Sequence, residues 1–558
     1  MKAAKTQGNC RPTRISTGLL VCGALLFVAS EGRAFGAQQN AARASKPSAA
    51  GSRAPKRTDI AKFNARVDAA LSDAKAQKSF WGIVVLDRAT GETLYELNAD
   101  KYFTPASNAK IVTSSFALAT LGPDFRFRTT LETAGPIGAD GSVKGDVVLV
   151  GRGDPDLSNR VFPYAGKAEH DGPMEKVLLE MVDAAIAKGV KQIDGHIVAD
   201  DSYYPYDPYP PGWNVGDLFF TYGAPVSAIS FNDNSFELEI TPGLQVGDAA
   251  SIGVQPLAAA GTFTQKIVTG PAGSQPNFSV TRQPGVNFIF LRGTIPLAHA
   301  PVKLDLAMTQ PAETAALALK QSFESRGVRV GGTATVHHAL PPEIYPDSNV
   351  VLGPAPEPTP LNTTVLAEHL SPTSLETARM TNKVSQNLHA ELLLRAAARA
   401  TKGFGVTEAG IWAEQDFLRN IGVADDDVLL EDGSGLSGGD LVTPRSLAQV
   451  LHFDAQQPWG EGYISTFPIA GVDGTLENRM KKTSAAGMVF AKTGSLEHVR
   501  ALSGFATTVR GEHLVFSIFG NNNAQPGHDA QSVIDSIAIA MVETLGAPPP
   551  PVKKTKKK

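Results

Sequence analysis

At 558 residues, the chain is longer than one hydrophobic core usually serves, so we expect two or three domains. Its formal charge of −4 gives no reason to expect binding to nucleic acid. Both cysteines, Cys10 and Cys22, lie near the N-terminus. The rest of the chain therefore has no disulfide, no thiolate metal site and no cysteine nucleophile.

Residues 1–36 are typical of a secretory signal peptide. Four basic residues precede an apolar run over residues 18–29, and Ala34-Phe35-Gly36 offers small residues for cleavage. We therefore predict an exported, periplasmic protein. Two alternatives stay open: an uncleaved membrane helix, for which the run is short, and a lipidated Cys22, next to which Val21 is bulky. Residues 37–58 are rich in Ala, Ser, Gln and Pro and predict a flexible linker.

Ordered structure is predicted to begin near residue 59. Apolar residues at helical spacing predict a first helix over residues 63–71. A buried strand over residues 81–86, a turn and a partner strand over 93–97 then form a hairpin. A helix is expected from Ser107 to Leu121.

Residues 126–365 differ from both flanks, because short β-like runs alternate with Gly and Pro turns. From residue 366 to 546 the pattern returns to helices and then strands. The expected helices cover residues 174–188, 312–326, 377–400, 406–421, 444–453 and 531–545, and the expected late strands cover 488–490, 501–508 and 513–519. We therefore predict one α/β domain made of residues 59–125 and 366–546, interrupted by inserted accessory domains at 126–365.

The tail, residues 547–558, contains four prolines and then five lysines. A solvated, disordered end is the favoured interpretation. The alternative is a weak electrostatic contact with a membrane surface or a cell-wall polymer.

Three short motifs carry most of the chemical information. They are Ser107-Asn108-Ala109-Lys110, Ser385-Gln386-Asn387 and Lys492-Thr493-Gly494. This is the S-x-x-K, S-x-N, K-T-G set of serine enzymes that react with penicillin and D-alanyl peptides. Each motif alone is weak, since Ser107 could simply cap a helix and Lys110 could lie at the surface. Their order and context favour a catalytic site.

A serine hydroxyl needs a base before it can attack a carbonyl. Lys110 lies one helical turn beyond Ser107 on the same face, so its amine can reach the hydroxyl. To act as a base it must be neutral, and we expect burial and the second cation, Lys492, to lower its pKa.

The other two motifs supply proton transfer and substrate binding. Ser385 can pass a proton between Lys110 and the leaving amine, and Asn387 can hold a substrate amide. Lys492 and Thr493, expected on an edge strand, can bind a terminal carboxylate. Gly494 allows close approach. The backbone N–H groups of Ser107 and Ser495 are expected to form the oxyanion hole, worth about 2.7–4 kcal/mol per donor.

From about Trp81 to Ala540 the chain resembles the class C low-molecular-mass penicillin-binding proteins, the D-alanyl-D-alanine carboxypeptidase/endopeptidase family. Besides the three motifs, the resemblance rests on six further stretches. They are Gly151-Arg152-Gly153-Asp154-Pro155, Asp200-Asp201-Ser202, Pro210-Pro211-Gly212-Trp213, Tyr222-Gly223-Ala224-Pro225, Asp432-Gly433-Ser434-Gly435-Leu436-Ser437 and Ala470-Gly471-Val472-Asp473-Gly474-Thr475-Leu476.

The resemblance implies a β-lactamase/transpeptidase-like catalytic domain split by a long insertion that forms two smaller, β-rich domains. It also implies a serine D-Ala-D-Ala carboxypeptidase or DD-endopeptidase that acts on peptidoglycan peptides, is trapped by β-lactams and needs no metal or organic cofactor. In the family, an acidic residue in the stretch matching Asp201 helps to read a free amine on the substrate. We therefore expect Asp201 to contact substrate, although a turn or cap role is its bland alternative.

The chain departs from the family in one stretch. The family usually has an arginine directly after D-G-S-G-L-S, where this chain has Gly438-Gly439-Asp440. If that arginine contacts the peptide stem, its replacement alters substrate preference but leaves acylation intact. His389 and the pair His337-His338 lack metal-ligand spacing and are interpreted as structural or surface residues.

Three other functions remain open from the sequence. A β-lactamase shares the motifs but is normally about half this length. A D-amino-acid amidase or esterase would act on small substrates rather than on peptidoglycan. A non-catalytic cell-wall-binding scaffold is disfavoured, because every motif residue is intact.

Overall fold

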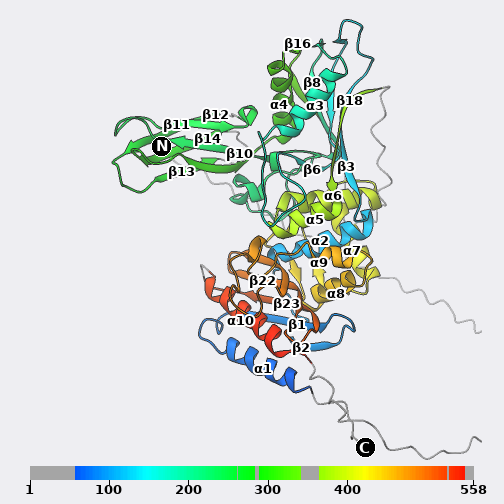
Figure 1. Cartoon of the computed structure of the whole chain (residues 1–558), viewed down its shortest axis with the longest axis vertical. Helices are drawn as coiled ribbons and strands as arrows, with labels where there is room; N and C mark the ends of the chain where they lie inside the picture. The colour runs from blue at the N-terminus through cyan, green and yellow to red at the C-terminus, as the bar shows by residue number, and fades with distance from the viewer. Residues whose placement is uncertain (1–56, 260–261, 283–287, 341–362, 525–526, 547–558) are drawn as a thin grey trace, which may run out of the picture. The chain divides into compact units, whose positions relative to one another are not determined.

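The computed structural model describes residues 57–259, 262–282, 288–340, 363–524 and 527–546, which belong to one compact unit, Arg57–Lys558 (Figure 1). The predicted signal peptide, nearly all of the predicted linker and the Pro/Lys-rich tail lie outside the described residues. Within the described residues, no helix is long and apolar enough to cross a membrane.

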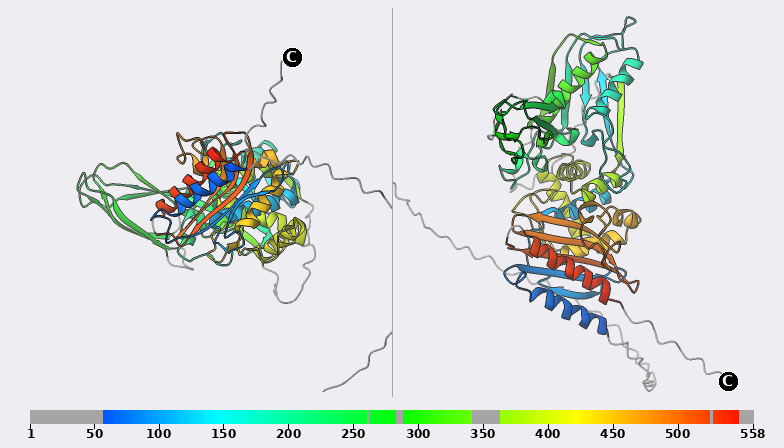
Figure 2. Two further views of the ribbon diagram at one scale, coloured as in Figure 1. Left: turned by 90° about the horizontal axis from the view of Figure 1, so that it is seen from below. Right: turned by 60° about the vertical axis from the view of Figure 1, so that its left-hand side comes forward.

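Both ends of the chain build one antiparallel five-stranded sheet, in the order β2-β1-β23-β22-β21. Its strands are β1 (Phe80–Asp87), β2 (Thr93–Leu97), β21 (Val489–Leu496), β22 (Val499–Thr507) and β23 (His513–Asn521). Helices α1 (Thr58–Leu71) and α10 (His528–Thr544) lie side by side against this sheet (Figures 1 and 2). The predicted α/β domain drawn from both chain ends is thereby confirmed in its topology.

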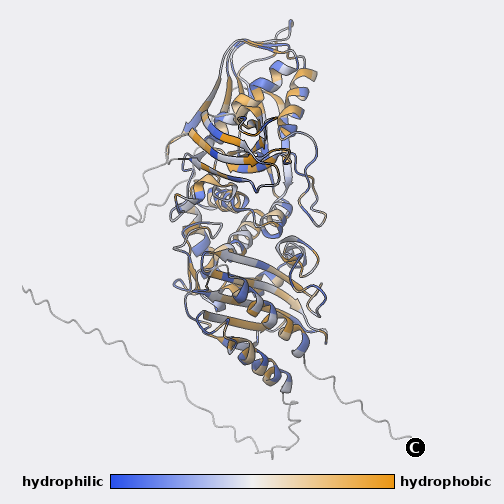
Figure 3. Cartoon of the chain, turned by 90° about the vertical axis from the view of Figure 1, so that its left-hand side faces the viewer, coloured by the Kyte–Doolittle hydropathy of each residue, from blue (hydrophilic) through white to orange (hydrophobic). Residues whose placement is uncertain are grey.

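Alternating side chains of β1 separate two cores. Ile83 and Val85 pack with α1 and α10, whereas Val84 and Leu86 pack with helices on the opposite face. The helices of this second core are α2 (Ala109–Leu121), α5 (Ser374–Lys383), α7 (Thr407–Asn420), α8 (Pro444–Ala455) and α9 (Gly460–Ile464), while α6 (Asn387–Lys402) packs on α2 and α7. Several helices carry hydrophobic and hydrophilic stretches together, as helices with one buried face do (Figure 3).

One predicted helix, over residues 377–400, is in fact two. The chain breaks between α5 and α6, because Ser385 adopts a positive φ of 63°, which no α-helix accommodates. The side chain of Gln386 then accepts the N–H of Leu388 and caps α6. The break removes Ser385 from the helix and leaves Asn387 as the first residue of α6.

The insertion contains a second five-stranded sheet, in the order β17-β8-β5-β3-β18. Its strands are β3 (Arg126–Thr133), β5 (Val147–Val150), β8 (Ile197–Pro205), β17 (Ala334–Ala339) and β18 (Thr364–Thr373), and α3 (Lys176–Ala187) and α4 (Pro311–Ser325) share its core. Because β18 pairs with β3 as far as Thr373, this sheet extends beyond residue 365, where we predicted the insertion to end.

Three further three-stranded sheets make the insertion β-rich, as predicted. Their orders are β11-β10-β15, β12-β14-β13 and β16-β7-β4. The strands of the first two are β10 (Ser235–Thr241), β11 (Ser251–Gln255), β12 (Thr262–Gly270), β13 (Asn277–Arg282), β14 (Phe288–Pro296) and β15 (Val302–Ala307). The remaining short strands are β4 (Ser142–Val143), β6 (Asp154–Leu157), β7 (Gln192–Ile193), β9 (Ile229–Phe231), β16 (Arg329–Val330), β19 (Val428–Leu429) and β20 (Leu441–Val442).

Candidate active site

The first motif lies at the turn that enters α2. A single 3₁₀ turn, Ala106–Asn108, precedes the helix, and Ser107 is half-buried there. Ala106 has a positive φ of 49°, a strained conformation for a residue with a Cβ. Strain of this kind tends to occur at functional sites, where the surrounding structure holds a reactive side chain in place.

Lys110 lies one turn beyond Ser107 and faces it. Its Nζ is 3.0 Å from Ser107 Oγ, and it also donates to Asn387 Oδ1 at 2.6 Å and to the carbonyl of Ser434 at 2.5 Å. A neutral lysine amine has two N–H groups and one lone pair. Asn387 and Ser434 accept the two N–H groups, so the lone pair is left for the Ser107 hydroxyl. The geometry suits a general base acting on Ser107.

Burial lowers the pKa of Lys110 to about 8, although the negative charges of Asp432, Glu391 and Asp440 oppose this shift. At such a pKa the Lys110 amine is neutral in about a tenth of the molecules at pH 7. The two lysines repel each other when both are charged, which disfavours the protonated form of each. Burial and then the charge of Lys110 hold the pKa of Lys492 well below its usual range.

The second motif occupies the break between α5 and α6. Ser385 Oγ accepts a hydrogen bond from Lys492 Nζ at 2.7 Å, which joins the second motif to the third. Asn387 Nδ2 donates to the carbonyl of Tyr222 at 2.8 Å. This bond sets the orientation of the amide, so that its oxygen points at Lys110.

The third motif lies on β21, an edge strand of its sheet, as predicted. Thr493 is half-buried and Ser495 is exposed, so both are accessible from the open side of the strand. Gly494 packs so tightly on the Ser107 turn that a Cβ there would lie 2.5 Å from the carbonyl oxygen of Pro105. The strand and the Ser107 turn are therefore in direct backbone contact.

Two backbone carbonyls complete the site and were missed in the sequence. The carbonyl of Tyr222 comes from the insertion and orients Asn387. The carbonyl of Ser434 belongs to the D-G-S-G-L-S stretch and accepts from Lys110. The D-G-S-G-L-S stretch was the only sequence signal for the Ser434 carbonyl. Every residue type has a backbone carbonyl, so the residue itself does not show which one accepts a hydrogen bond.

Asp201 makes its contacts apart from the three motifs. It is 2% exposed on β8 and accepts from Ser227 Oγ at 2.8 Å and from His338 Nδ1 at 2.6 Å. With both carboxylate oxygens engaged inside the insertion, it has a structural role in this conformation. The acidic side chain bonded to the Tyr222 segment is Asp217, which accepts from the Tyr222 hydroxyl at 3.3 Å.

The stretch that replaces the family arginine closes its loop by a short internal contact. Asp440 is buried and accepts the N–H of Glu431 at 2.7 Å. Gly438 is exposed and has open space around the position of a Cβ. There is therefore room for a side chain at position 438, where this chain has a glycine.

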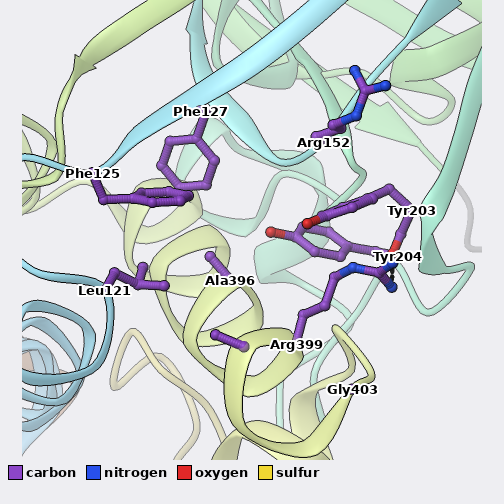
Figure 4. A pocket seen from close by; sticks show the side chains of 10 residues that line it. Leu121, Phe125, Phe127, Arg152, Tyr203, Tyr204, Ala396, Arg399 and Gly403 are labelled. Atoms are coloured by element: carbon purple, nitrogen blue, oxygen red, sulfur yellow. Dashed lines mark hydrogen bonds between the residues drawn. The ribbon is translucent and has the colours of Figure 1, made fainter. Parts of the chain in front are cut away.

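A cavity of about 200 Å³ lies at the far end of α6 and is distinct from these motifs (Figure 4). Phe127, Tyr203 and Tyr204 form part of its wall, and Arg399 stacks on the ring of Tyr203 at 3.8 Å. Its closest lining residue on α6, Ala396, is roughly 13 Å along the helix from Asn387. Within the described residues, no group of three or more His, Cys, Asp or Glu side chains is placed to hold a metal ion.

Comparisons with known proteins agree with this geometry. The model of the D-Ala-D-Ala carboxypeptidase 3 (S13) family matches residues 63–541. The chain is 33% identical over 491 residues to a D-alanyl-D-alanine carboxypeptidase of Actinomadura sp. (strain R39), covering 86% of this chain and 84% of that protein. It is 27% identical over 444 residues to a D-alanyl-D-alanine carboxypeptidase of Haemophilus influenzae, covering 79% and 85%.

The fold is similar to that of a solved structure. Penicillin binding protein 4 from Haemophilus influenzae superposes with a TM-score of 0.71 at 24% identity, covering 85% of this chain and 98% of that chain. The expected transpeptidase-like domain with β-rich insertions is thereby confirmed. The motifs, their geometry and the extent of these matches lead to one conclusion: the chain belongs to the D-Ala-D-Ala carboxypeptidase 3 (S13) family of serine-type hydrolases.

Proposed function

We propose that the chain cleaves D-Ala-D-Ala ends, and cross-links that end in a D-amino acid, in peptidoglycan stem peptides through an acyl-enzyme on Ser107. One observation carries the assignment of the nucleophile. Lys110 Nζ lies 3.0 Å from Ser107 Oγ, while Asn387 and Ser434 accept its two N–H groups. Membership of the family supports the substrate class.

Acylation begins when neutral Lys110 takes the proton of the Ser107 hydroxyl. Ser107 Oγ attacks the carbonyl carbon of the penultimate D-Ala and forms a tetrahedral intermediate. The scissile C–N bond then breaks, and the leaving amine receives a proton through Ser385, whose Oγ is bonded to Lys492. The products of this step are free D-Ala and an ester on Ser107.

Deacylation reverses the proton movements. Lys110 takes a proton from water, the resulting hydroxide attacks the ester carbon, and the C–Oγ bond breaks as Ser107 regains a proton. We assign oxyanion stabilisation to the backbone N–H groups of Ser107 and Ser495, each worth about 2.7–4 kcal/mol. Lys492 and Thr493 bind the terminal carboxylate, and Gly494 admits the peptide close to the strand.

For a free amine on the substrate side chain, Asp217 is a better candidate than Asp201. Asp217 is half-buried in the segment whose Tyr222 carbonyl orients Asn387, and it accepts a hydrogen bond from the neutral Tyr222 hydroxyl. Asp201 is already bonded to His338 and Ser227. A carboxylate with an uncharged partner can still pair with an ammonium group.

Export and cell-wall contact complete the proposal. The pattern over residues 1–36 supports export to the periplasm, where peptidoglycan lies. The lysines of residues 553–558 support a weak contact with anionic polymer or lipid.

The assignment is tested by intact-protein mass after incubation with benzylpenicillin, with Ser107→Ala as the control. We expect a stable one-to-one adduct on the natural protein alone, followed by release of D-Ala from a peptide ending in D-Ala-D-Ala. Rapid turnover of penicillin without an adduct would indicate a β-lactamase. Turnover of small esters but not of peptidoglycan would indicate an esterase or amidase, and no adduct in a folded sample would leave only the scaffold.

A further inference from the structure

One buried carboxylate organises the loop between β19 and β20. Asp432 is fully buried and accepts five hydrogen bonds from its surroundings. The donors are Trp213 Nε1 at 2.7 Å, Ser434 Oγ at 2.8 Å, and the backbone N–H groups of Gly435 at 2.7 Å, Leu436 at 3.0 Å and Ser437 at 3.2 Å. A carboxylate that accepts several N–H groups holds a loop in one conformation.

The same loop contacts α2 and the 3₁₀ turn before it at three points. The carbonyl of Ser434 accepts from Lys110, and the carbonyl of Gly433 accepts from Thr113 at 2.8 Å. Gly435, at a positive φ of 75°, lies so close to Ala106 that a Cβ would be 1.9 Å from its carbonyl oxygen. A small shift of this loop would therefore move the acceptor that orients the Lys110 amine.

The insertion reaches this carboxylate through a single turn. Trp213 donates its indole N–H to Asp432, and Gly212 packs on the loop with a Cβ position 2.1 Å from Ser437 Oγ. Gly212 has a positive φ of 76°, so both its conformation and its surroundings exclude a side chain. The turn at Gly212 and Trp213 therefore packs closely against the loop between β19 and β20.

We propose that Asp432 and Trp213 are positioning residues for acylation. Asp432 holds the Ser434 carbonyl against Lys110, and the Trp213 indole from the insertion completes the set of donors that fixes Asp432. Docking of the insertion thereby sets the direction of the Lys110 lone pair. This inference rests on the proposed function, because it assigns a role in the same acylation step.

The charged groups around Lys110 predict a signature that distinguishes positioning from simple stability. Lys492 faces it from β21, Glu391 from α6, and Asp432 and Asp440 from the loop. Removing the Asp432 charge takes away a group that favours the protonated amine. In a variant without the Asp432 charge, the rise of the acylation rate with pH, the acid limb of the profile, should therefore occur at lower pH. The maximal rate, the plateau, should also fall, because the Ser434 carbonyl is no longer held against Lys110.

The test measures the second-order rate of acylation by a fluorescent penicillin from pH 6 to 10, together with the melting temperature. Trp213→Phe keeps the ring and removes the N–H, and we expect a plateau lowered about tenfold, the value of one hydrogen bond to a charged group. Asp432→Asn should lower the plateau further and shift the acid limb. The matched control is Trp81→Phe, which removes an indole N–H bonded to the Ala76 carbonyl at 2.9 Å on the α1 side of the sheet.

Trp81→Phe should lower the melting temperature and leave the acylation rate and its pH profile unchanged. A natural-like rate in folded Trp213→Phe would overturn the role of Trp213. If Asp432→Asn lowers the plateau but does not shift the acid limb, Asp432 has only a structural role. Failure of the natural protein to be acylated would instead overturn the proposed function, and this inference with it.

Discussion

Replacing Asn387 by aspartate should keep Lys110 protonated at neutral pH and so remove the base. The new carboxylate would occupy the position of the amide oxygen, which lies 2.6 Å from Lys110 Nζ. At an effective dielectric constant of about 20, unit charges at that distance attract by roughly 6 kcal/mol. The cost of burying the carboxylate and the lost bond to the Tyr222 carbonyl oppose this attraction.

If half of that attraction remains, about 3 kcal/mol, the pKa of Lys110 rises by about two units. It would then move from about 8 to roughly 10, and the neutral fraction at pH 7 would fall from about one tenth to about one thousandth. We therefore expect acylation to slow about 100-fold at pH 7. By pH 10 the loss should shrink to a few fold, because about half of the variant's Lys110 amine is then neutral.

The assay is the rate of acylation by a fluorescent penicillin across pH 6 to 10. The matched control is Asn234→Asp, because the Asn234 amide is also buried, accepts from the Phe231 N–H at 2.9 Å and donates to the Pro225 carbonyl at 2.7 Å. Asn234→Asp should lower the stability of the protein without changing the pH profile of acylation. An equal loss at every pH for Asn387→Asp would refute Lys110 as the titrating base.

Three further outcomes are expected. Burial raises the pKa of Glu414 from 4.5 to about 8, so the folded state holds a proton that the unfolded state releases, and stability falls as pH rises from 4.5 towards 8. Glu414→Gln should therefore have a free energy of unfolding up to about 3 kcal/mol higher than that of the natural protein at pH 7, and an equal one at pH 4.5. Urea unfolding at both pH values measures this, and a gain independent of pH would contradict it. Gly494→Ala should slow acylation at least about tenfold, because its Cβ meets the Pro105 carbonyl, whereas Gly135→Ala, in open space, should be silent in rate and melting temperature. Asp217→Asn should lower kcat/KM about tenfold for a peptide with a free side-chain amine and leave penicillin acylation unchanged; a larger effect from Asp201→Asn would restore the role first expected for that residue.

The sequence by itself determined the chemistry and the broad architecture of this protein. The three motifs are local, so the spacing of Ser107 and Lys110 on one helix turn, or of Lys492 and Thr493 on one strand, follows from secondary structure alone. The edge position of β21 and the β-rich insertion also followed, because hydrophobic patterns and turn residues report on local structure.

Only the tertiary structure decided how these pieces act together. Lys110 meets Asn387 across 277 positions, and the carbonyls of Ser434 and Tyr222 orient the pair, yet a carbonyl leaves no mark in a sequence. The motif at Ser385 fits a loop or helix start, but the helical pattern over residues 377–400 does not show the break there, because packing overrides propensity. The contacts of Asp201 likewise depended on His338, a partner 137 positions away, and no local pattern records such a distance.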